Sequence, residues 1–144
     1  IIEILARDAR TPHAQIAEEI GLSRPAVTER VKKLENNGII KGYSAILNPN
    51  SLGQAITAFI SAKHPGVLTA EVQKALKELE DNSEVLEIHS IAGEDCFLIK
   101  VRTKDMTSLN RIINELKKPP LTMATKTTIV LESYFEKIGG TVLK

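Results

Sequence analysis

The stretch of residues 14–43 constrains the fold of this chain more than any other part of it. It contains two short segments with apolar residues at helical spacing, and Gly21 lies between them. A glycine there favours a tight turn with a positive φ angle. Ser23 follows as a typical helix N-cap, and Pro25 lies near the helix start, where a missing N–H group does little harm. This order predicts two helices joined by a tight turn, followed by an extended segment over residues 39–47.

The second of these helices has the side chains of a helix that reads DNA. A helix-turn-helix places its second helix in the major groove, where polar and cationic side chains meet bases and phosphates. We therefore predict a DNA interface on this helix and its cap, made of Ser23, Arg24, Pro25, Thr28, Glu29, Arg30, Lys32 and Lys33. An ordinary helical hairpin without a DNA role is the other interpretation.

Within this interface the residues have different expected roles. Arg24, Thr28 and Glu29 are predicted at base edges, and Arg30, Lys32 and Lys33 closer to phosphates. Glu29 has a competing role, because it could instead pair with a lysine along the helix. Many helix-turn-helix motifs have an apolar residue where this chain has Arg30, so Arg30 must reach the surface, a phosphate or an acidic partner.

Several short motifs accompany this turn, namely Asp8-Ala9-Arg10, Ile16-Ala17, Gly21-Leu22-Ser23, Arg30-Val31, Leu34-Glu35, Gly38-Ile39-Ile40 and Gly42-Tyr43. The run of residues 8–49 that contains them resembles the DNA-binding half of the Lrp/AsnC (feast/famine) family of bacterial and archaeal transcription regulators. Arg30, unusual in the general motif, agrees with this family. The second half of the chain also fits, so the resemblance covers nearly the whole sequence.

Composition places few limits on function. The net charge of +1 does not by itself indicate a nucleic-acid binder, so DNA affinity would have to come from local placement of cations. A single cysteine excludes an intrachain disulfide and a cysteine-based metal site. We see no apolar run of membrane-spanning length and no leader, so we expect a cytoplasmic protein without a membrane partner. Because the chain begins at Ile1 without methionine, we expect a short N-terminal piece to precede it.

The polar residues 48–51 interrupt the pattern and mark a predicted domain boundary. After them we expect strands at 55–63, 85–92, 96–103 and 123–135, and helices at 68–79 and 106–116. This β-α-β-β-α-β order is the ferredoxin-like split. The predicted architecture is α+β: a three-helix, winged-helix-like helix-turn-helix domain with a following strand at 1–47, a linker at 48–54, and a ferredoxin-like dimerisation and effector domain at 55–144.

The strands also carry an expectation about assembly. Apolar residues alternate in the third and last strands so that both faces of the sheet are predicted to be partly apolar; Ile129 and Leu131, for example, alternate with Val130. Two helices cover only one face of a four-stranded sheet, so we expect a second subunit to cover the other face. The resemblance agrees, because this family dimerises through such a domain and often forms octamers.

The predicted hairpin turn Gly93-Glu94-Asp95 is a candidate binding site. Exposed backbone N–H groups there suit a carboxylate, and Asp95 could hold an ammonium group, although an ordinary tight turn explains the spacing equally well. The resemblance implies that a Gly-x-Asp turn binds an amino-acid effector between neighbouring dimers, together with polar residues of the last strand. Those residues would be Thr125 and Thr127, which β-propensity alone would also explain.

No catalytic constellation is visible in the sequence. His13, His64 and His89 lie far apart and form no pair at metal-ligand spacing, and we expect neither a metal nor a cofactor. Two alternatives to an effector-controlled regulator stay open. The chain could be an oligomeric DNA-binding protein without an effector, or an enzyme or small-molecule sensor whose helix-turn-helix contacts protein.

Overall fold

Two separate hydrophobic cores organise the chain in the computed structural model, which describes residues 1–139. One core belongs to Ile1–Leu47, and residues 135–139 group with this first unit; the other core belongs to Asn48–Tyr134. The sequence predicts a second domain that extends from residue 55 to residue 144. Residues 140–144 of this range lie outside the described residues. The expected linker, 48–54, groups with the second unit and contains the short helix η1 (Asn50–Leu52).

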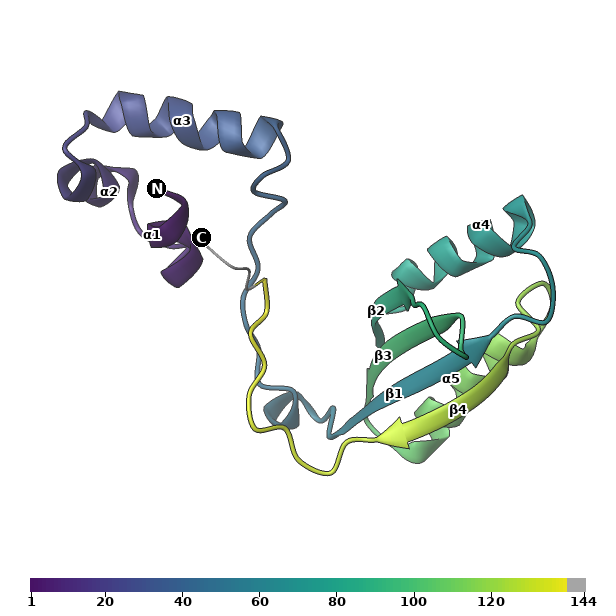
Figure 1. The fold of residues 1–144 in the computed structure, drawn as a ribbon. Coiled ribbons are helices and arrows are strands. Elements are labelled where there is room, and N and C mark those ends of the chain that lie inside the picture. Colours follow the sequence, from purple (N-terminus) through teal and green to yellow (C-terminus); the bar gives the residue numbers. More distant parts are fainter. Residues whose placement is uncertain (140–144) are drawn as a thin grey trace. The chain divides into compact units, whose positions relative to one another are not determined.

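The first unit contains the helices α1 (Ile2–Arg7), α2 (His13–Ile20) and α3 (Arg24–Asn36), drawn from purple to blue in Figure 1. Ile4, Ile16, Ala17, Val27 and Val31 are buried among them and form its core. This small core is possible because each helix contributes one apolar face. The predicted three-helix arrangement is confirmed.

The segment 39–47 differs from the expectation, because it forms no strand. The N–H groups of Ile39 and Ile40 both donate to the carbonyl oxygen of Leu34, at 2.9 and 3.1 Å, and so complete the end of α3. A strand exists only with a hydrogen-bonded neighbour, and the sequence of a single segment does not show whether it has one.

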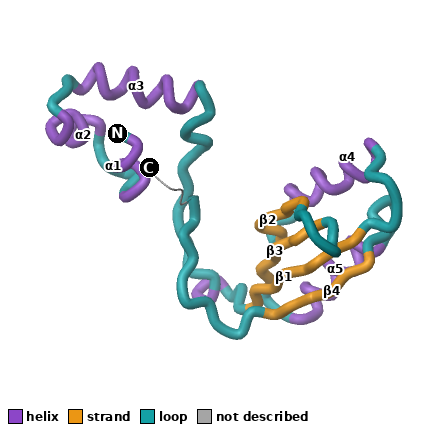
Figure 2. Tube along the Cα trace, viewed as in Figure 1, coloured by secondary structure: helices purple, strands orange, loops and turns teal. Residues whose placement is uncertain are grey.

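The second unit is a four-stranded antiparallel sheet with strand order β2-β3-β1-β4. Figure 2 shows these strands in orange with the helices in purple. The bounds are β1 Ile56–Lys63, α4 Ala70–Glu78, η2 Leu79–Asp81, β2 Val85–Ser90, β3 Phe97–Thr103, α5 Met106–Lys117 and β4 Ala124–Ile129. The predicted β-α-β-β-α-β order is confirmed.

The last strand is shorter than the predicted range 123–135. It ends at Ile129, and one further bond joins the N–H of Val130 to the carbonyl of Thr57 at 2.8 Å. Beyond it the apolar side chains of Leu131, Tyr134 and Phe135 are exposed. In this register the first residue of β1, Ile56, lies opposite Leu131, so most of the predicted range past Ile129 extends beyond β1.

Both long helices of the second unit pack on the same face of the sheet. Side chains of α4 and α5, such as Val72, Leu109 and Leu116, belong to one core with buried residues of β1 and β3. The buried strand residues occupy alternate positions: Ala58, Ile60, Ala62, Phe97, Ile99 and Val101. This alternation shows which side of every strand faces the helices.

The other side of the sheet, which we call the open face, is mostly polar. From the strand register it includes Thr57, Phe59, Ser61, Lys63, Glu87, His89, Leu98, Lys100, Arg102, Ala124, Lys126 and Thr128. The predicted partly apolar second face is seen at Phe59, Leu98 and Ala124, whereas Lys100 and Arg102 occupy the other open-face positions of β3. Ile129 pairs with Ala58 and so lies on the helix side.

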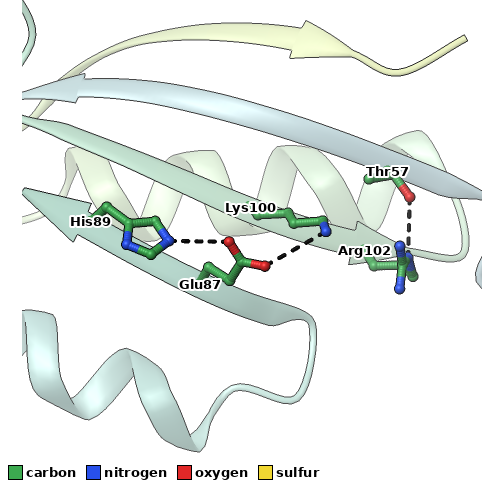
Figure 3. Close-up of polar contacts among 5 residues, drawn as sticks. All are labelled: Thr57, Glu87, His89, Lys100 and Arg102. Atoms are coloured by element: carbon green, nitrogen blue, oxygen red, sulfur yellow. Dashed lines mark hydrogen bonds and ion pairs between the residues drawn. The ribbon is translucent and has the colours of Figure 1, made fainter. Parts of the chain in front are cut away.

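Polar contacts connect the strands across the open face (Figure 3). Glu87 accepts a hydrogen bond from Nε2 of His89 at 3.1 Å and pairs with Nζ of Lys100 at 3.6 Å. The hydrogen bond from His89 is the main cause that lowers the pKa of Glu87, with the charge of Lys100 adding to it. A register shift between Val85 and Glu87 brings Glu87 opposite Lys100, and Nε of Arg102 donates to Oγ1 of Thr57 at 3.1 Å.

Candidate nucleic-acid interface and effector site

The start of α3 is built as its sequence predicts. Gly21 has a φ angle of 68°, which a residue with a side chain rarely adopts, and ends α2 there. Leu22 packs on the core of the first unit, and Oγ of Ser23 accepts a hydrogen bond from the N–H of Ala26 at 3.3 Å. Ser23 is therefore the N-cap of α3, and Pro25 lies in the first turn.

Most of the predicted DNA-contacting residues lie together. A shallow groove of about 450 Å³ on α3 is lined by Arg24, Pro25, Thr28, Glu29 and Lys32. All of these side chains are exposed except Thr28, which is half-buried. Two cations beside a carboxylate, a hydroxyl and a small apolar side chain suit a surface that must approach both phosphates and base edges.

Glu29 and Lys33 form an ion pair along α3, with a distance of 3.0 Å between Nζ and Oε1. Both side chains are 69% exposed, so the pair contributes little to stability. The pair partly neutralises Glu29, the carboxylate of the groove, and Arg24 and Lys32 are the cations that line it.

Arg30 lies away from this groove. It lines a second, larger groove of about 740 Å³ in the first unit, together with Lys33 and the apolar residues Ile2, Ile20 and Leu34. The helical repeat explains the separation, because Arg30 is two positions from both Thr28 and Lys32 and so points to another side. The structure therefore does not bring Arg30 together with the groove residues.

One residue of this region was missed by the sequence analysis. Nδ1 of His13, at the start of α2, lies 2.9 Å from Oγ1 of Thr28, and the same Thr28 hydroxyl donates to the carbonyl of Arg24 at 3.1 Å. His13 precedes Thr28 by fifteen positions. Spacing within one helix therefore contains no signal of this contact, and only the packing of α2 on α3 creates it.

The predicted effector turn connects β2 and β3. The N–H of Ile91 donates to the carbonyl of Cys96 at 3.0 Å and closes the hairpin, which leaves Gly93, Glu94 and Asp95 at its tip. Gly93 has a φ angle of 151°, which favours glycine, and open space surrounds the position where a Cβ atom would lie. Gly93 and Glu94 are exposed, and Asp95 is half-buried.

Thr125 and Thr127 lie on the same side of β4, as the sequence predicted. They pair with Ala62 and Ile60, which are buried under the helices, so both threonines lie on the helix side of the sheet and are half-buried. The hairpin joins the edge strand β2 to the inner strand β3, and β1 lies between β3 and β4. Two to three strand spacings, or about 9–14 Å, therefore separate the turn from β4. Thr125 and Thr127 are thus not on a strand next to the turn.

Two further features, a metal site and a membrane-spanning helix, are absent from the described part of the chain. Residues 1–139 contain no group of three or more potential ligands that could hold a metal ion. Their helices are also too short or too polar to cross a membrane.

Comparison with known proteins agrees with both units. Residues 1–41 match the family model described as winged helix-turn-helix DNA-binding, and residues 57–139 match the Lrp/AsnC ligand binding domain. The HTH-type transcriptional regulator FL11 of Pyrococcus abyssi is 35% identical over 136 residues, which cover 94% of this chain and 88% of that protein.

Solved structures give the same result. The leucine response regulatory protein LrpA of Mycobacterium tuberculosis superimposes with a TM-score of 0.84 at 29% identity, covering 94% of this chain and 91% of that one. A feast or famine regulatory protein of M. tuberculosis in complex with L-methionine gives 0.83 at 30% identity, covering 94% and 90%. These relatives are transcriptional regulators and not enzymes. With a helix-turn-helix unit, a ferredoxin-like ligand-binding domain and relatives along nearly its whole length, the chain belongs to the Lrp/AsnC family of transcriptional regulators.

Proposed function

We propose that this protein binds specific DNA sequences in the cytoplasm and regulates transcription in response to a free amino acid. The groove on α3 is the observation that carries the DNA half of the proposal. Its cations Arg24 and Lys32 flank Thr28 on the exposed side of a helix whose start is fixed by a cap and a glycine turn. An ordinary helical hairpin has no need of such a groove.

The parts of the chain then have separate tasks. Residues 1–47 would bind DNA, residues 48–54 would connect, and residues 55–144 would dimerise and bind the effector. In the groove, Arg24 and Thr28 would face base edges and Lys32 a phosphate. Glu29 and Lys33 would contribute less, since they pair with each other, and Ser23 would act mainly by capping α3.

A homodimer is the natural form for this task. Two copies related by a two-fold axis would present two α3 helices to successive major grooves of a near-palindromic site. The open face is the proposed contact between the two subunits. Phe59 and Leu98 are half-buried on it, and Glu87 beside them contacts His89 and Lys100. Pairing of these charges within each subunit limits charge repulsion between the two facing sheets. A higher oligomer such as an octamer would follow from dimers meeting at the effector turns. Analytical ultracentrifugation at micromolar concentration tests the dimer, and a monomer there would contradict it.

The effector would bind where two chains meet. A free amino acid carries a carboxylate, which suits the backbone N–H groups around Gly93, and an ammonium group, which suits Asp95. Because β1 lies between the turn's strand β3 and β4, and Thr125 and Thr127 lie on the helix side of the sheet, we assign these threonines to a different chain than the turn. The L-methionine complex of the M. tuberculosis relative supports an amino acid as the class of ligand.

Regulation would follow from binding between chains. An amino acid that occupies the junction of two chains stabilises the assembly that forms the junction. It shifts the population of assemblies only because it binds this assembly more tightly than assemblies that lack the junction. The spacing of the α3 pairs would change with the assembly, and so would the DNA sites that it fits.

Thermal stability with each of the twenty amino acids tests the effector proposal. A ligand at one hundred times its Kd adds about 2.7 kcal/mol to the stability of the state that binds it, which is a clear rise in midpoint. Asp95→Ala should abolish this rise, whereas Asp81→Ala, which removes an exposed carboxylate elsewhere in the same unit, should leave it intact. If no amino acid stabilises the protein, or if Asp95→Ala binds normally, this placement is wrong. The protein would then be better described as an effector-independent DNA-binding oligomer.

A further inference from the structure

We propose that Thr28 recognises a thymine through its methyl group, and that His13 of α2 is the positioning residue that holds Thr28 in this role. The inference rests on the proposed function, because it takes α3 to lie in the major groove. Nothing in the sequence connects these two residues, and the inference follows from the hydrogen bonds around one hydroxyl group.

The Thr28 hydroxyl has one hydrogen, and the structure shows where it goes. Oγ1 lies 3.1 Å from the carbonyl oxygen of Arg24, which can only accept, so Thr28 donates its hydrogen there. Nδ1 of His13 lies 2.9 Å from the same Oγ1 and must therefore be the donor of the second bond. Nδ1 carries a hydrogen in one neutral tautomer and in the protonated ring, so the bond persists when the ring gains a proton.

Two hydrogen bonds fix the orientation of the Thr28 side chain. A β-branched residue in a helix has few χ1 rotamers, and these bonds select the one that turns Oγ1 toward the backbone of α3 and toward α2. Thr28 also lines the groove with Arg24, Pro25 and Lys32. Since the only hydroxyl hydrogen is donated to Arg24 and His13 uses one of the two lone pairs, Thr28 cannot donate to a base. Its methyl group and one lone pair are what it can offer to a ligand in that groove.

The chemistry of the major groove gives the methyl group a specific partner. Among the four bases only thymine displays a methyl group there, and an apolar side-chain contact is a known way to read it. A hydroxyl group free to rotate could instead serve several bases, because it both donates and accepts. By holding the hydroxyl, His13 prevents Thr28 from rotating to donate to a base and fixes its methyl group, which narrows the preference of Thr28 toward thymine.

The experiment uses the full-length protein and DNA that it selects itself from a random pool of duplexes. Each thymine of the selected sequence is then replaced by deoxyuridine, which removes only the methyl group, and affinity is measured by fluorescence anisotropy. One thymine in each half-site should show a loss of about fourfold, the equivalent of roughly 0.8 kcal/mol for one buried methyl-sized group.

Variants assign that loss to residues. Thr28→Ser keeps the hydroxyl bonds and removes the methyl group, so it should bind the thymine and deoxyuridine sites equally. Thr28→Val keeps a methyl group in place and should retain the preference. His13→Ala should reduce the preference, and His13→Asn should restore it, because the asparagine amide nitrogen can occupy the place of Nδ1 and donate to Oγ1.

Each outcome decides something. If the wild-type protein selects no sequence, both the proposed DNA function and this inference fail. If it selects a sequence but no thymine is sensitive to methyl loss, or if Thr28→Ser keeps the full preference, the methyl reading is wrong and the DNA function stands. If Thr28→Ser loses the preference for thymine over deoxyuridine but His13→Ala keeps it in full, Thr28 reads the methyl group without help from His13, and the positioning role of His13 is wrong.

Discussion

Ser23→Ala distinguishes a helix cap from a DNA contact, because the two roles predict different losses. Replacing an N-cap serine by alanine costs about 0.5–2 kcal/mol. The bond from the Ala26 N–H to Oγ of Ser23 is 3.3 Å long, beyond the common length of about 2.9–3.0 Å, and Ser23 is exposed. We therefore expect the lower part of that range, about 0.7 kcal/mol, or a threefold change in the opening equilibrium of α3.

Amide hydrogen exchange measures this change separately for each unit of the protein. The amides of α3 should exchange about threefold faster in Ser23→Ala, with those of the second unit unchanged. Thr69→Ala is the matched control, since Oγ1 of Thr69 caps α4 through the Val72 N–H at the same 3.3 Å. It should accelerate exchange in α4 alone and leave DNA affinity intact.

A third variant separates the two roles further. Ser23→Asp keeps a capping oxygen and should protect α3 as well as serine does, but its negative charge beside DNA phosphates should weaken DNA binding. Unchanged exchange of the α3 amides in Ser23→Ala would refute the capping argument, whatever happened to DNA affinity.

Three further predictions concern the second unit and the DNA groove. Ile60 is fully buried, so Ile60→Ala should lower the free energy of unfolding of the second unit by about 2–5 kcal/mol in a denaturant titration, without faster exchange in α1–α3. The lowered pKa of Glu87 means that its carboxylate stabilises the fold above its usual pKa of 4.5 and that this stabilisation is lost as pH falls through the lower, folded value. In Glu87→Gln the free energy of unfolding should therefore fall less steeply than in the wild type as pH drops below 4.5. Equal slopes for the two proteins would contradict the role of His89. Lys32→Ala should reduce the slope of log affinity against log salt by about 0.9 for each bound subunit, whereas Lys74→Ala on the exposed side of α4 should leave it unchanged.

Local signals in the sequence predicted the first unit well. The turn between α2 and α3 depends on Gly21 and Ser23, whose effects act within a few residues of their own positions. The order of strands and helices in the second unit was likewise readable from periodicity. These features need no knowledge of what lies opposite in space.

Features that depend on a spatial partner were harder to predict. Alternation placed Thr125 and Thr127 on one side of β4, but only their register with Ala62 and Ile60 shows that it is the helix side. The expectation that β4 continues past Ile129 was wrong for the same reason, because the sequence of one strand does not show where its partner strand ends. The contact between His13 and Thr28 belongs to this class as well, because it joins two helices.

Because of the register shift between Val85 and Glu87, the two edges of the sheet differ in how well they can pair with an additional strand. A bulge interrupts the regular spacing of N–H and C=O groups, so an incoming strand cannot keep step along the outer edge of β2, where Glu87 adds a charge. The pairing of β4 with β1 runs without interruption from Ala124 to Ile129, and β4 has no second neighbour within the described residues. A strand from another polypeptide would therefore find regularly spaced backbone groups beside β4 and not beside β2.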